Sequence, residues 1–253
     1  MKVSVIMPVY NRETYIGSAI RSILRQRDAA DLDIIVVDDG STDGTNRAVR
    51  SASEGTACLR LIHQPHKGVS AARNNGLAHV SSDSELITFL DSDDISVAGR
   101  FAAELPLFRD EPLLALTYSR MTLTNEIDEN TLLPGENAHT CTVRGISLAT
   151  AIFRKQAIDS LGGFNEGLVQ SEDWDFLLRF FEMRQKHLML EHVSILHRRH
   201  PGNATKDRAE SMRNYLRVLL LSTRRRRLDP SLGSLPRFFD VSELFDDVNA
   251  PLR

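Results

Sequence analysis

Cysteine is scarce in this sequence of 253 residues, which contains two, Cys58 and Cys141. Two cysteines are too few for a disulfide framework, and they lack the spacing of metal ligands. We therefore expect a reducing compartment, in which both are small core residues. The chain also has no low-complexity linker and no internal repeat. One large α/β domain, or such a domain with an appendage, is the expected organisation.

Long hydrophobic runs and a strong net charge are also missing. No apolar stretch approaches the roughly 20 residues that a membrane-spanning helix needs. The chain opens directly on a predicted strand, with no basic leader or cleavage site. We therefore expect a cytoplasmic protein that is at most peripheral, at the inner face of the membrane. The net charge of −3 predicts no affinity for nucleic acid.

Two glycine-rich phosphate-binding patterns are absent. No G-x-G-x-x-G follows the first predicted strand, and G-x-x-x-x-G-K-[ST] occurs nowhere in the chain. A dinucleotide-binding motif and a P-loop are therefore disfavoured. What remains open is a nucleotide site built from carboxylates, a metal ion and an arginine.

Strands and helices alternate four times in the first part of the chain. Nearly continuous apolar segments predict buried parallel strands, and apolar residues at helical spacing predict helices between them. The strands are expected at residues 2–7, 32–37, 59–63 and 85–90. Pro8 is expected to stop the first strand, and Asn11 to cap the helix after it. This alternation predicts a parallel, doubly wound sheet.

The order is looser after Asp94. Helices are expected at residues 97–108, at 152–161 and from Ser171 onward, and strands at 113–117, 121–123 and 188–196. Residues 125–143 are polar and predict a loop long enough to serve a function.

The end of the chain is divided by charge. Residues 198–227 hold ten Lys/Arg against two Asp/Glu, whereas residues 228–253 hold two against five. A helix there is expected to end in Arg224, Arg225, Arg226 and Arg227. This run is either a solvated helix end or a contact with an anionic membrane or with the acidic final segment of another subunit in a homo-oligomer.

Polar residues follow three of the four predicted strands: Tyr10-Asn11-Arg12, Asp38-Asp39-Gly40 and Asp91-Ser92-Asp93. In a doubly wound sheet these strand ends line one crevice, where ligands bind. Clustered carboxylates can hold a hard divalent cation and, through it, a diphosphate. An Asp at the second strand end can accept from N3–H of uracil or thymine. Arg73 is placed to pair with phosphate oxygens or to hold Asp91.

Six segments, in this order and spacing, resemble the family 2 glycosyltransferases with their GT-A fold. They are Val3–Asn11, Asp38–Asp43, Gly68–Gly76, Leu90–Asp94, Gly163–Glu166 with Glu172–Asp175, and Arg198–Asn203. The resemblance covers residues 1–205. It implies a Rossmann-like, mostly parallel central sheet flanked by helices. A nucleotide-binding half at 1–95 and an acceptor-side half at 96–205 are expected, followed by a C-terminal helical tail at 206–253.

The resemblance implies transfer, with inversion, from a UDP- or dTDP-sugar, and assigns residues to the donor. Pro8, Tyr10 and Arg12 would line the base and ribose pocket, and Asp39 would read the pyrimidine with Asp38 beside it. Asp91 and Ser92 would contact the nucleotide. Asp93 would be the principal Mn²⁺ or Mg²⁺ ligand, with Asp91 and His200 near the metal. The cation would offset charge on the departing diphosphate.

On the acceptor side, Asp173 is the expected general base and Glu172 the alternative. A carboxylate at a helix start is expected to stay ionised. Helix capping alone would also explain both residues, but the neighbouring Gly163–Glu166 segment favours the catalytic interpretation. Trp174 is expected to stack on a sugar or to fill the core.

The expected function is metal-dependent glycosyl transfer in cell-surface polysaccharide biosynthesis, with a glycan, a lipid-linked or another hydroxyl acceptor. Two alternatives are a nucleotidyltransferase that makes the sugar nucleotide and an inactive relative that only binds nucleotide. The nucleotidyltransferase would need a basic glycine-rich loop after the first strand, which Tyr10-Asn11-Arg12 is not.

Overall fold

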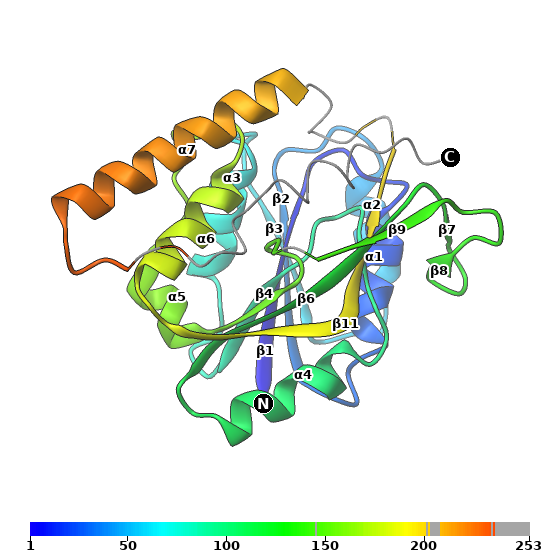
Figure 1. Cartoon of the computed structure of the whole chain (residues 1–253). Helices are drawn as coiled ribbons and strands as arrows, with labels where there is room; N and C mark the ends of the chain where they lie inside the picture. Colours follow the sequence, from blue (N-terminus) through cyan, green and yellow to red (C-terminus); the bar gives the residue numbers. More distant parts are fainter. Residues whose placement is uncertain (145, 201, 203–207, 234, 236–253) are drawn as a thin grey trace.

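Nine strands form the central sheet of the computed structural model, which describes residues 1–144, 146–200, 202, 208–233 and 235 (Figure 1). The first half contains β1 (Lys2–Val9), α1 (Ile16–Leu24), β2 (Asp31–Asp38), α2 (Thr45–Ala52), β3 (Leu59–His63), α3 (Val69–Ala78) and β4 (Leu86–Phe89). The second half contains β5 (Ile95–Ser96), α4 (Arg100–Asp110), β6 (Leu114–Thr124), β9 (Thr140–Val143), β10 (Ala151–Arg154), α5 (Lys155–Leu161), α6 (Glu172–Glu182), β11 (Lys186–Arg198) and α7 (Arg208–Leu228). A separate hairpin joins β7 (Ile127–Asp128) and β8 (Leu133–Pro134).

The strand order is β3-β2-β1-β4-β10-β6-β11-β5, with β9 beside β6. The first four strands pair in parallel, as the alternation predicts. The second half is mixed: β6 and β11 are parallel, whereas β10, β5 and β9 run antiparallel to their neighbours. The sheet is therefore an α/β sheet whose first half is doubly wound.

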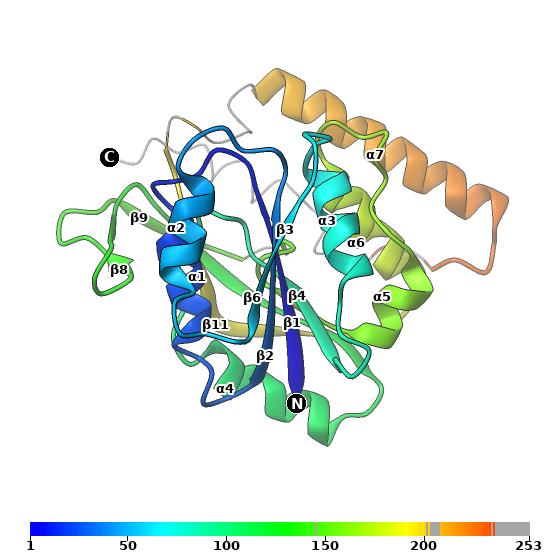
Figure 2. The ribbon, with the colours of Figure 1, turned by 180° about the vertical axis from the view of Figure 1, so that it is seen from behind.

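Apolar side chains fill both faces of the sheet. Val5 and Met7 of β1 pack with Ile20 of α1 and Phe101 of α4. On the other face the core joins β4 and β10 to helices α3, α5 and α6. Figure 2 shows α1 and α2 on one side of the strands and α3, α5 and α6 on the other. Alternate side chains of a strand point to opposite faces of the sheet, and here both faces are covered. The sequences of these strands are therefore almost continuously apolar.

Proline does not stop β1, contrary to the expectation. Pro8 lies within the strand and pairs in register with Val37 of β2. On its other side, β4 pairs only as far as Phe89, opposite Ile6. Pro8 therefore lies where β1 has a single neighbour, and a missing N–H can be tolerated there.

The expected cap at Asn11 is also wrong. Helix α1 begins at Ile16 after Tyr15, with no side-chain cap. Asn11 instead has φ 49°, and its Oδ1 accepts from the backbone N–H of Thr42 at 2.8 Å. Asn11 therefore joins the turns after β1 and β2.

The second half departs most from the sequence expectations. Residues 151–154 form strand β10 before α5 begins, because Ala151, Ile152 and Phe153 are fully buried between β4 and β6. A short apolar run does not distinguish a buried strand from a buried helix. The expected loop at 125–143 contains the β7–β8 hairpin and β9. The two strands expected at 113–117 and 121–123 are one strand, β6.

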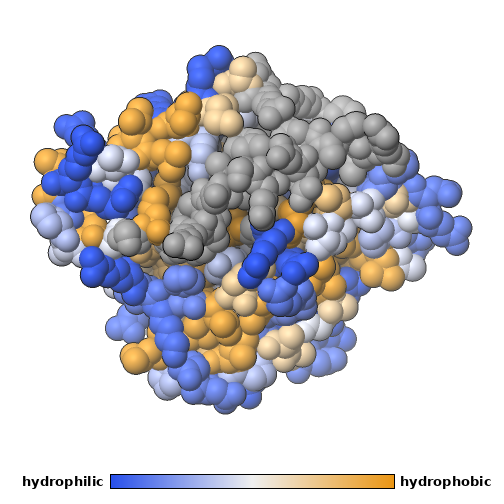
Figure 3. Space-filling view, in the orientation of Figure 1, coloured by the Kyte–Doolittle hydropathy of each residue, from blue (hydrophilic) through white to orange (hydrophobic). Residues whose placement is uncertain are grey.

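Helix α7 packs against α6 along one side. Val218 belongs to an apolar cluster with Leu168 and Leu178. Among the described residues, none of the helices is both long and apolar enough to cross a bilayer. In Figure 3, hydrophilic and hydrophobic side chains lie side by side along the edge of the molecule where α7 runs in Figure 1. The acidic segment at 236–253 lies outside the described residues.

Candidate functional site

The polar turns after β1, β2 and β4 meet at one edge of the sheet, as predicted. The backbone N–H of Asn11 donates to Ser41 Oγ at 2.9 Å, which joins the first two turns. Arg12 Nε donates to Asp93 Oδ2 at 3.2 Å, which joins the first turn to the third. This edge is where the sequence places the nucleotide.

Asp93 and His200 form the centre of the candidate cation site. His200 Nε2 lies 3.1 Å from Asp93 Oδ2. Two adjacent ligands of an octahedral cation with bonds of about 2.1 Å lie about 3.0 Å apart, so the pair has the separation of a shared cation. The N–H of Gly202 donates to His200 Nδ1 at 2.9 Å. Nε2 therefore carries the proton in the neutral ring, and would have to release it to bind a metal.

Asp91, the third expected ligand, faces elsewhere. Its Oδ1 accepts from Arg73 NH2 at 3.0 Å. Within the part of the chain that the structure describes, no three His, Cys, Asp or Glu side chains are gathered as a cation site. Asp93 and His200 are therefore two candidate ligands for a divalent cation, with waters and diphosphate oxygens left to complete its shell. The carboxylate suits Mn²⁺ or Mg²⁺, whereas an imidazole nitrogen is an unusual ligand for Mg²⁺.

Arg73 connects this edge to the acceptor side. It is buried in α3, and its NH1 donates to Glu172 Oε1 of α6 at 2.6 Å. Burial lowers the pKa of Arg73, but the carboxylates of Asp91, Glu172 and Asp173 outweigh burial and hold that pKa above its ordinary value. Of the two roles expected for Arg73, the structure gives it the second, holding Asp91.

The two carboxylates that open α6 differ in their partners. Glu172 is paired with Arg73, whereas Asp173 Oδ1 accepts from the backbone N–H of Trp174 at 2.8 Å. Burial, and next the charge of Glu172, raise the pKa of Asp173 to about 7. The expectation that the helix start keeps this group fully ionised is therefore wrong, because desolvation outweighs the helix dipole. A carboxyl group with a pKa near neutrality is suited to accept a proton.

Ser171, directly before these two residues, has a left-handed backbone with φ 62°. It makes no side-chain cap to the helix. Strained backbone of this kind is concentrated at functional sites. Ser171 therefore does not cap α6, whereas Asp173 accepts from a backbone N–H of its first turn.

Asp38 and Asp39 hold loops. Asp38 is buried, and although burial raises its pKa, hydrogen bonds from Ser41, Asn46 and His63 bring that pKa below its ordinary value. The carboxylate of Asp39 accepts from the backbone N–H groups of Lys67 and Gly68, each at 2.8 Å. Asp38 and Asp39 are 2% and 3% exposed. Asp38 holds the turn after β2 through Ser41 and Asn46, and its place beside Asp39 at the nucleotide stays a prediction.

Asp39 also borders an exposed surface through His66, which the sequence reasoning missed. His66 Nδ1 lies 2.8 Å from Asp39 Oδ2. The ring of His66 stacks on Tyr10 with centroids 4.1 Å apart, and Tyr10 is exposed. Pro8 and Ser92, by contrast, are buried. No sequence pattern marks His66, because its contact depends on the β3–α3 loop folding back over Asp39.

Trp174 and Arg225 belong to the contact between α6 and α7. The ring of Trp174 meets that of Tyr215 edge-on, with centroids 5.3 Å apart, so Trp174 has a packing role. Arg225 NH1 donates to Asp175 at 2.8 Å and its Nε to Glu182 at 2.9 Å. The interpretation of Arg224–Arg227 as one exposed run is therefore wrong. Arg225 is seven positions after Val218, and this helical spacing could have placed Arg225 on the inner face of the helix from the sequence.

His197, next to the metal turn, has a structural partner. Its Nδ1 lies 3.0 Å from Asp94 Oδ2, and Asp94 Oδ1 accepts from the N–H of Arg198 at 3.0 Å. The carboxylate of Asp94 raises the pKa of His197 to about 9. The exclusion of His197 from the expected ligands agrees with this pairing.

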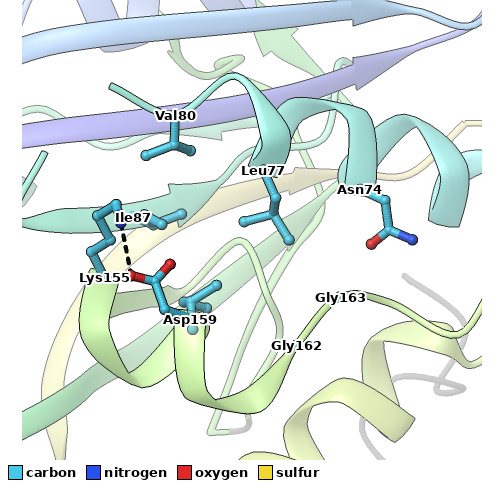
Figure 4. A pocket seen from close by; sticks show the side chains of 9 residues that line it. Asn74, Leu77, Val80, Ile87, Lys155, Asp159, Gly162 and Gly163 are labelled. Atoms are coloured by element: carbon cyan, nitrogen blue, oxygen red, sulfur yellow. Dashed lines mark hydrogen bonds and ion pairs between the residues drawn. The ribbon is translucent and has the colours of Figure 1, made fainter. Parts of the chain in front are cut away.

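A pocket of about 340 Å³ opens between α3 and α5 (Figure 4). Leu77, Val80 and Ile87 form its apolar side, and Lys155 pairs with Asp159 at 2.7 Å at its rim. It contains none of the residues predicted for the site. The strand-end crevice therefore remains the candidate site.

A sequence model of glycosyl transferase family 2 matches residues 4–162. The glycosyltransferase GlyA of Streptococcus pneumoniae is 42% identical over 93 residues, which are 37% of this chain and 13% of that protein. A Campylobacter jejuni protein named GalNAc(5)-diNAcBac-PP-undecaprenol beta-1,3-glucosyltransferase is 40% identical over 100 residues, 39% of this chain and 31% of its own. The chain thus spans less than a third of the length of either relative.

Solved structures share the fold. S. aureus TarS in complex with UDP-GlcNAc has a TM-score of 0.70 at 21% identity, over 88% of this chain and 65% of TarS. Glucosyl-3-phosphoglycerate synthase of Mycobacterium tuberculosis, in complex with Mn²⁺, UDP and phosphoglyceric acid, has a TM-score of 0.62 at 19% identity, over 87% of this chain and 78% of that one. These likenesses confirm the predicted α/β fold of the GT-A type.

Proposed function

Because the chain belongs to glycosyl transferase family 2, we propose that it transfers a sugar, with inversion, from a nucleotide-sugar to a hydroxyl acceptor in cell-surface polysaccharide biosynthesis. One observation carries the proposal. Arg73 contacts both Asp91 and Glu172, at 3.0 and 2.6 Å. It thereby brings the carboxylate turn after β4 next to the first turn of α6, where Asp173 lies. A donor site and a proton acceptor are thus joined by one buried side chain.

The donor is a UDP- or dTDP-sugar held at the strand-end crevice. Tyr10 with His66 offers an exposed aromatic surface for the base, and the Asp39 carboxylate beside it can accept from N3–H of a pyrimidine when His66 moves aside. Arg12 lies over the Asp93 turn and can pair with phosphate oxygens. TarS binds UDP-GlcNAc and the mycobacterial synthase binds UDP, which supports a uridine nucleotide.

Asp93 and His200 would hold Mn²⁺ or Mg²⁺, with Asp91 nearby. When bound, such a cation offsets the negative charge of a departing diphosphate. The chain's own contribution is the positioning of these ligands. Arg12 and Arg73 fix Asp93 and Asp91 from opposite sides of the turn.

Asp173 is the general base. The acceptor hydroxyl attacks the anomeric carbon, its proton passes to Asp173, and the bond between the sugar and the diphosphate breaks with its electron pair on the diphosphate. Inversion follows from this single displacement. Glu172 is unsuited to the role because its carboxylate is committed to Arg73 at 2.6 Å. Glu172 instead raises the pKa of Asp173, which makes the base effective near neutral pH.

A lipid-linked glycan is the proposed acceptor. The Campylobacter relative carries an undecaprenol diphosphate-linked acceptor in its name. The nucleotidyltransferase alternative gains no support, because the turn after β1 is held by its contacts to Ser41 and Asp93 and contains no glycine.

A thermal-shift panel tests the donor proposal. UDP, dTDP, GDP and CMP are compared with and without Mn²⁺, and UDP or dTDP with Mn²⁺ should raise the melting temperature most. Asp93→Asn should remove the metal-dependent part of the shift. The matched control Asp110→Asn changes an exposed carboxylate and should leave the shift intact. Metal-independent stabilisation, or none by any nucleotide, would overturn the proposal.

A further inference from the structure

Helix α7 has two faces of different chemistry. Its inner face packs on α6 through Tyr215 and Val218, which are buried, and through the ion pairs of Arg225 with Asp175 and Glu182. These contacts fix the orientation of the helix about its own axis. The direction of its outer face is therefore defined.

The outer face combines arginines with exposed leucines. Its six members are Arg213, Leu216, Arg217, Leu220, Arg224 and Arg227, and we call it the Arg/Leu face. At 100° per residue, these positions fall within a sector of about 100°. Leu216 is 51% exposed and Leu220 71%, and the four arginines are exposed as well. The one acidic residue of α7, Glu210, lies in its first turn, outside the sector.

We propose that the Arg/Leu face binds the surface of an anionic lipid bilayer. Four arginines on one face form a positively charged surface, and each interacts favourably with anionic headgroups. Leucines exposed between the arginines need an apolar environment only a few ångströms deeper. An anionic bilayer offers both at the same surface, with charge in the headgroup layer and hydrocarbon below it.

An ordinary solvated helix face would not combine these features. Scattered exposed apolar residues are common, but here both leucines are one helical turn apart and arginines flank them on each side. An acidic polypeptide could pair with the arginines, and it would also cover the leucines only if it were amphipathic itself. A bilayer provides both the negative charge and the apolar environment, whatever the sequence of a protein partner.

Helix α7 lies beside the helix that carries the proposed general base. The helix contacts the beginning of α6, since Asn214 Nδ2 donates to Gln170 at 3.0 Å and Tyr215 packs on Trp174. Asp173 lies next to Trp174. Binding of α7 to a membrane would therefore keep the protein at the bilayer that presents a lipid-linked hydroxyl, with α7 between the bilayer and the first turn of α6. The membrane binding itself does not depend on the proposed reaction.

Vesicle co-sedimentation of the full chain tests the proposal. One set of vesicles is pure phosphatidylcholine, and the other contains about one third phosphatidylglycerol, enough to give a negative surface potential. The protein should bind the anionic vesicles and not the neutral ones, and high salt should weaken binding. Replacing Arg213, Arg217, Arg224 and Arg227 by Gln should weaken it by about fivefold for each arginine.

Two further variants separate the contributions. Leu216→Ser with Leu220→Ser should also weaken binding, without changing the melting temperature, because both side chains are exposed. The control pair Arg27→Gln and Arg109→Gln removes two exposed arginines outside α7 and should bind like the parent protein.

Three outcomes would overturn the proposal. They are absence of binding to anionic vesicles, equal binding to neutral vesicles, and unchanged binding by the arginine and leucine variants. If sedimentation velocity instead shows self-association that these variants abolish, the face binds another copy of the chain. Because vesicle binding needs no nucleotide, its failure is distinct from failure of the glycosyl-transfer proposal.

Discussion

Arg73 NH1 donates to Glu172 Oε1 at 2.6 Å, although the two residues are 99 positions apart in the sequence. Both side chains are almost fully buried. The contact joins α3 to α6, and the second nitrogen of Arg73 extends it to Asp91 at 3.0 Å. One guanidinium therefore compensates carboxylates from both halves of the sheet.

Replacing Arg73 by Met should lower the free energy of unfolding by about 3 kcal/mol, because it leaves Glu172 buried without a counter-charge. Urea unfolding measures the loss. Lys155→Met is the control: its partner Asp159 is exposed, so removing the lysine leaves no buried charge, and the pair should contribute about 0.5 kcal/mol. The double variant Arg73→Met with Glu172→Gln should regain part of the loss. No recovery would show that Glu172 is not the destabilising group.

Asp173→Asn should stabilise the protein at neutral and higher pH. The folded-state pKa of Asp173 is raised to about 7 from an ordinary value of 3.8. Between these values the folded state binds more protons than the unfolded state, so stability falls as pH rises through this window. The variant should match the parent near pH 4 and have the higher melting temperature at pH 8. An equal or lower melting temperature at pH 8 would contradict the raised pKa.

Transfer activity should distinguish the two carboxylates at the start of α6. Asp173→Asn should retain nucleotide binding and lose transfer by about 10²–10⁴-fold, the usual contribution of a general base. Activity of the parent protein should rise with pH through about 7. Glu172→Gln should keep transfer but move this rise to lower pH, because the charge of Glu172 raises the pKa of Asp173. Full activity of Asp173→Asn would exclude it as the base.

Arg225 and Arg224 are a matched pair on α7. Arg225 contacts Asp175 and Glu182, whose side chains are each 2% exposed, whereas Arg224 is exposed. Arg225→Gln should lower the free energy of unfolding by about 3 kcal/mol, since the buried carboxylate of Glu182 loses its counter-charge, whereas Asp175 keeps its pair with Arg179 at 2.9 Å. Arg224→Gln should change it by less than about 0.5 kcal/mol. Equal effects in urea unfolding would show that α7 does not depend on this ion-pair cluster.

The first half of the fold could be predicted because β1, β2 and β4 are almost entirely buried and because a helix follows each of β1, β2 and β3. The second half could not be predicted in the same way. Residues 151–154 form an apolar run of strand length directly before a helix, and only the neighbours β4 and β6 decide that they are a strand. In the same way, the single-sided pairing at Pro8 is a property of where β4 ends.

The positions of the site residues could be predicted better than their partners. The sequence places Asp91, Asp93 and Asp173 at strand and helix ends, and the structure keeps them there. It does not reveal that Arg73 holds Glu172, or that burial raises the pKa of Asp173. The first is a contact between residues 99 positions apart, and the second depends on how deeply the helix start is buried, and the spacing of residues along the sequence predicts neither. The inward direction of Arg225 was available from helical periodicity.

The short strand β5 sets a limit on how this protein can be recombined. The chain leaves the Asp91–Asp94 turn, crosses beyond β10, β6 and β11, and pairs Ile95 and Ser96 at the far edge of the sheet. Strands β10, β6 and β11 are thus enclosed between β4 and β5, and the end of β4 at Phe89 and the start of β5 at Ile95 are six positions apart in the sequence. Chimeras joined after the aspartate turn would combine a β5 from one protein with the β4 and the turn of another. Chimeras between relatives are therefore better made by grafting the β6–β10 connection than by exchanging everything after the aspartate turn.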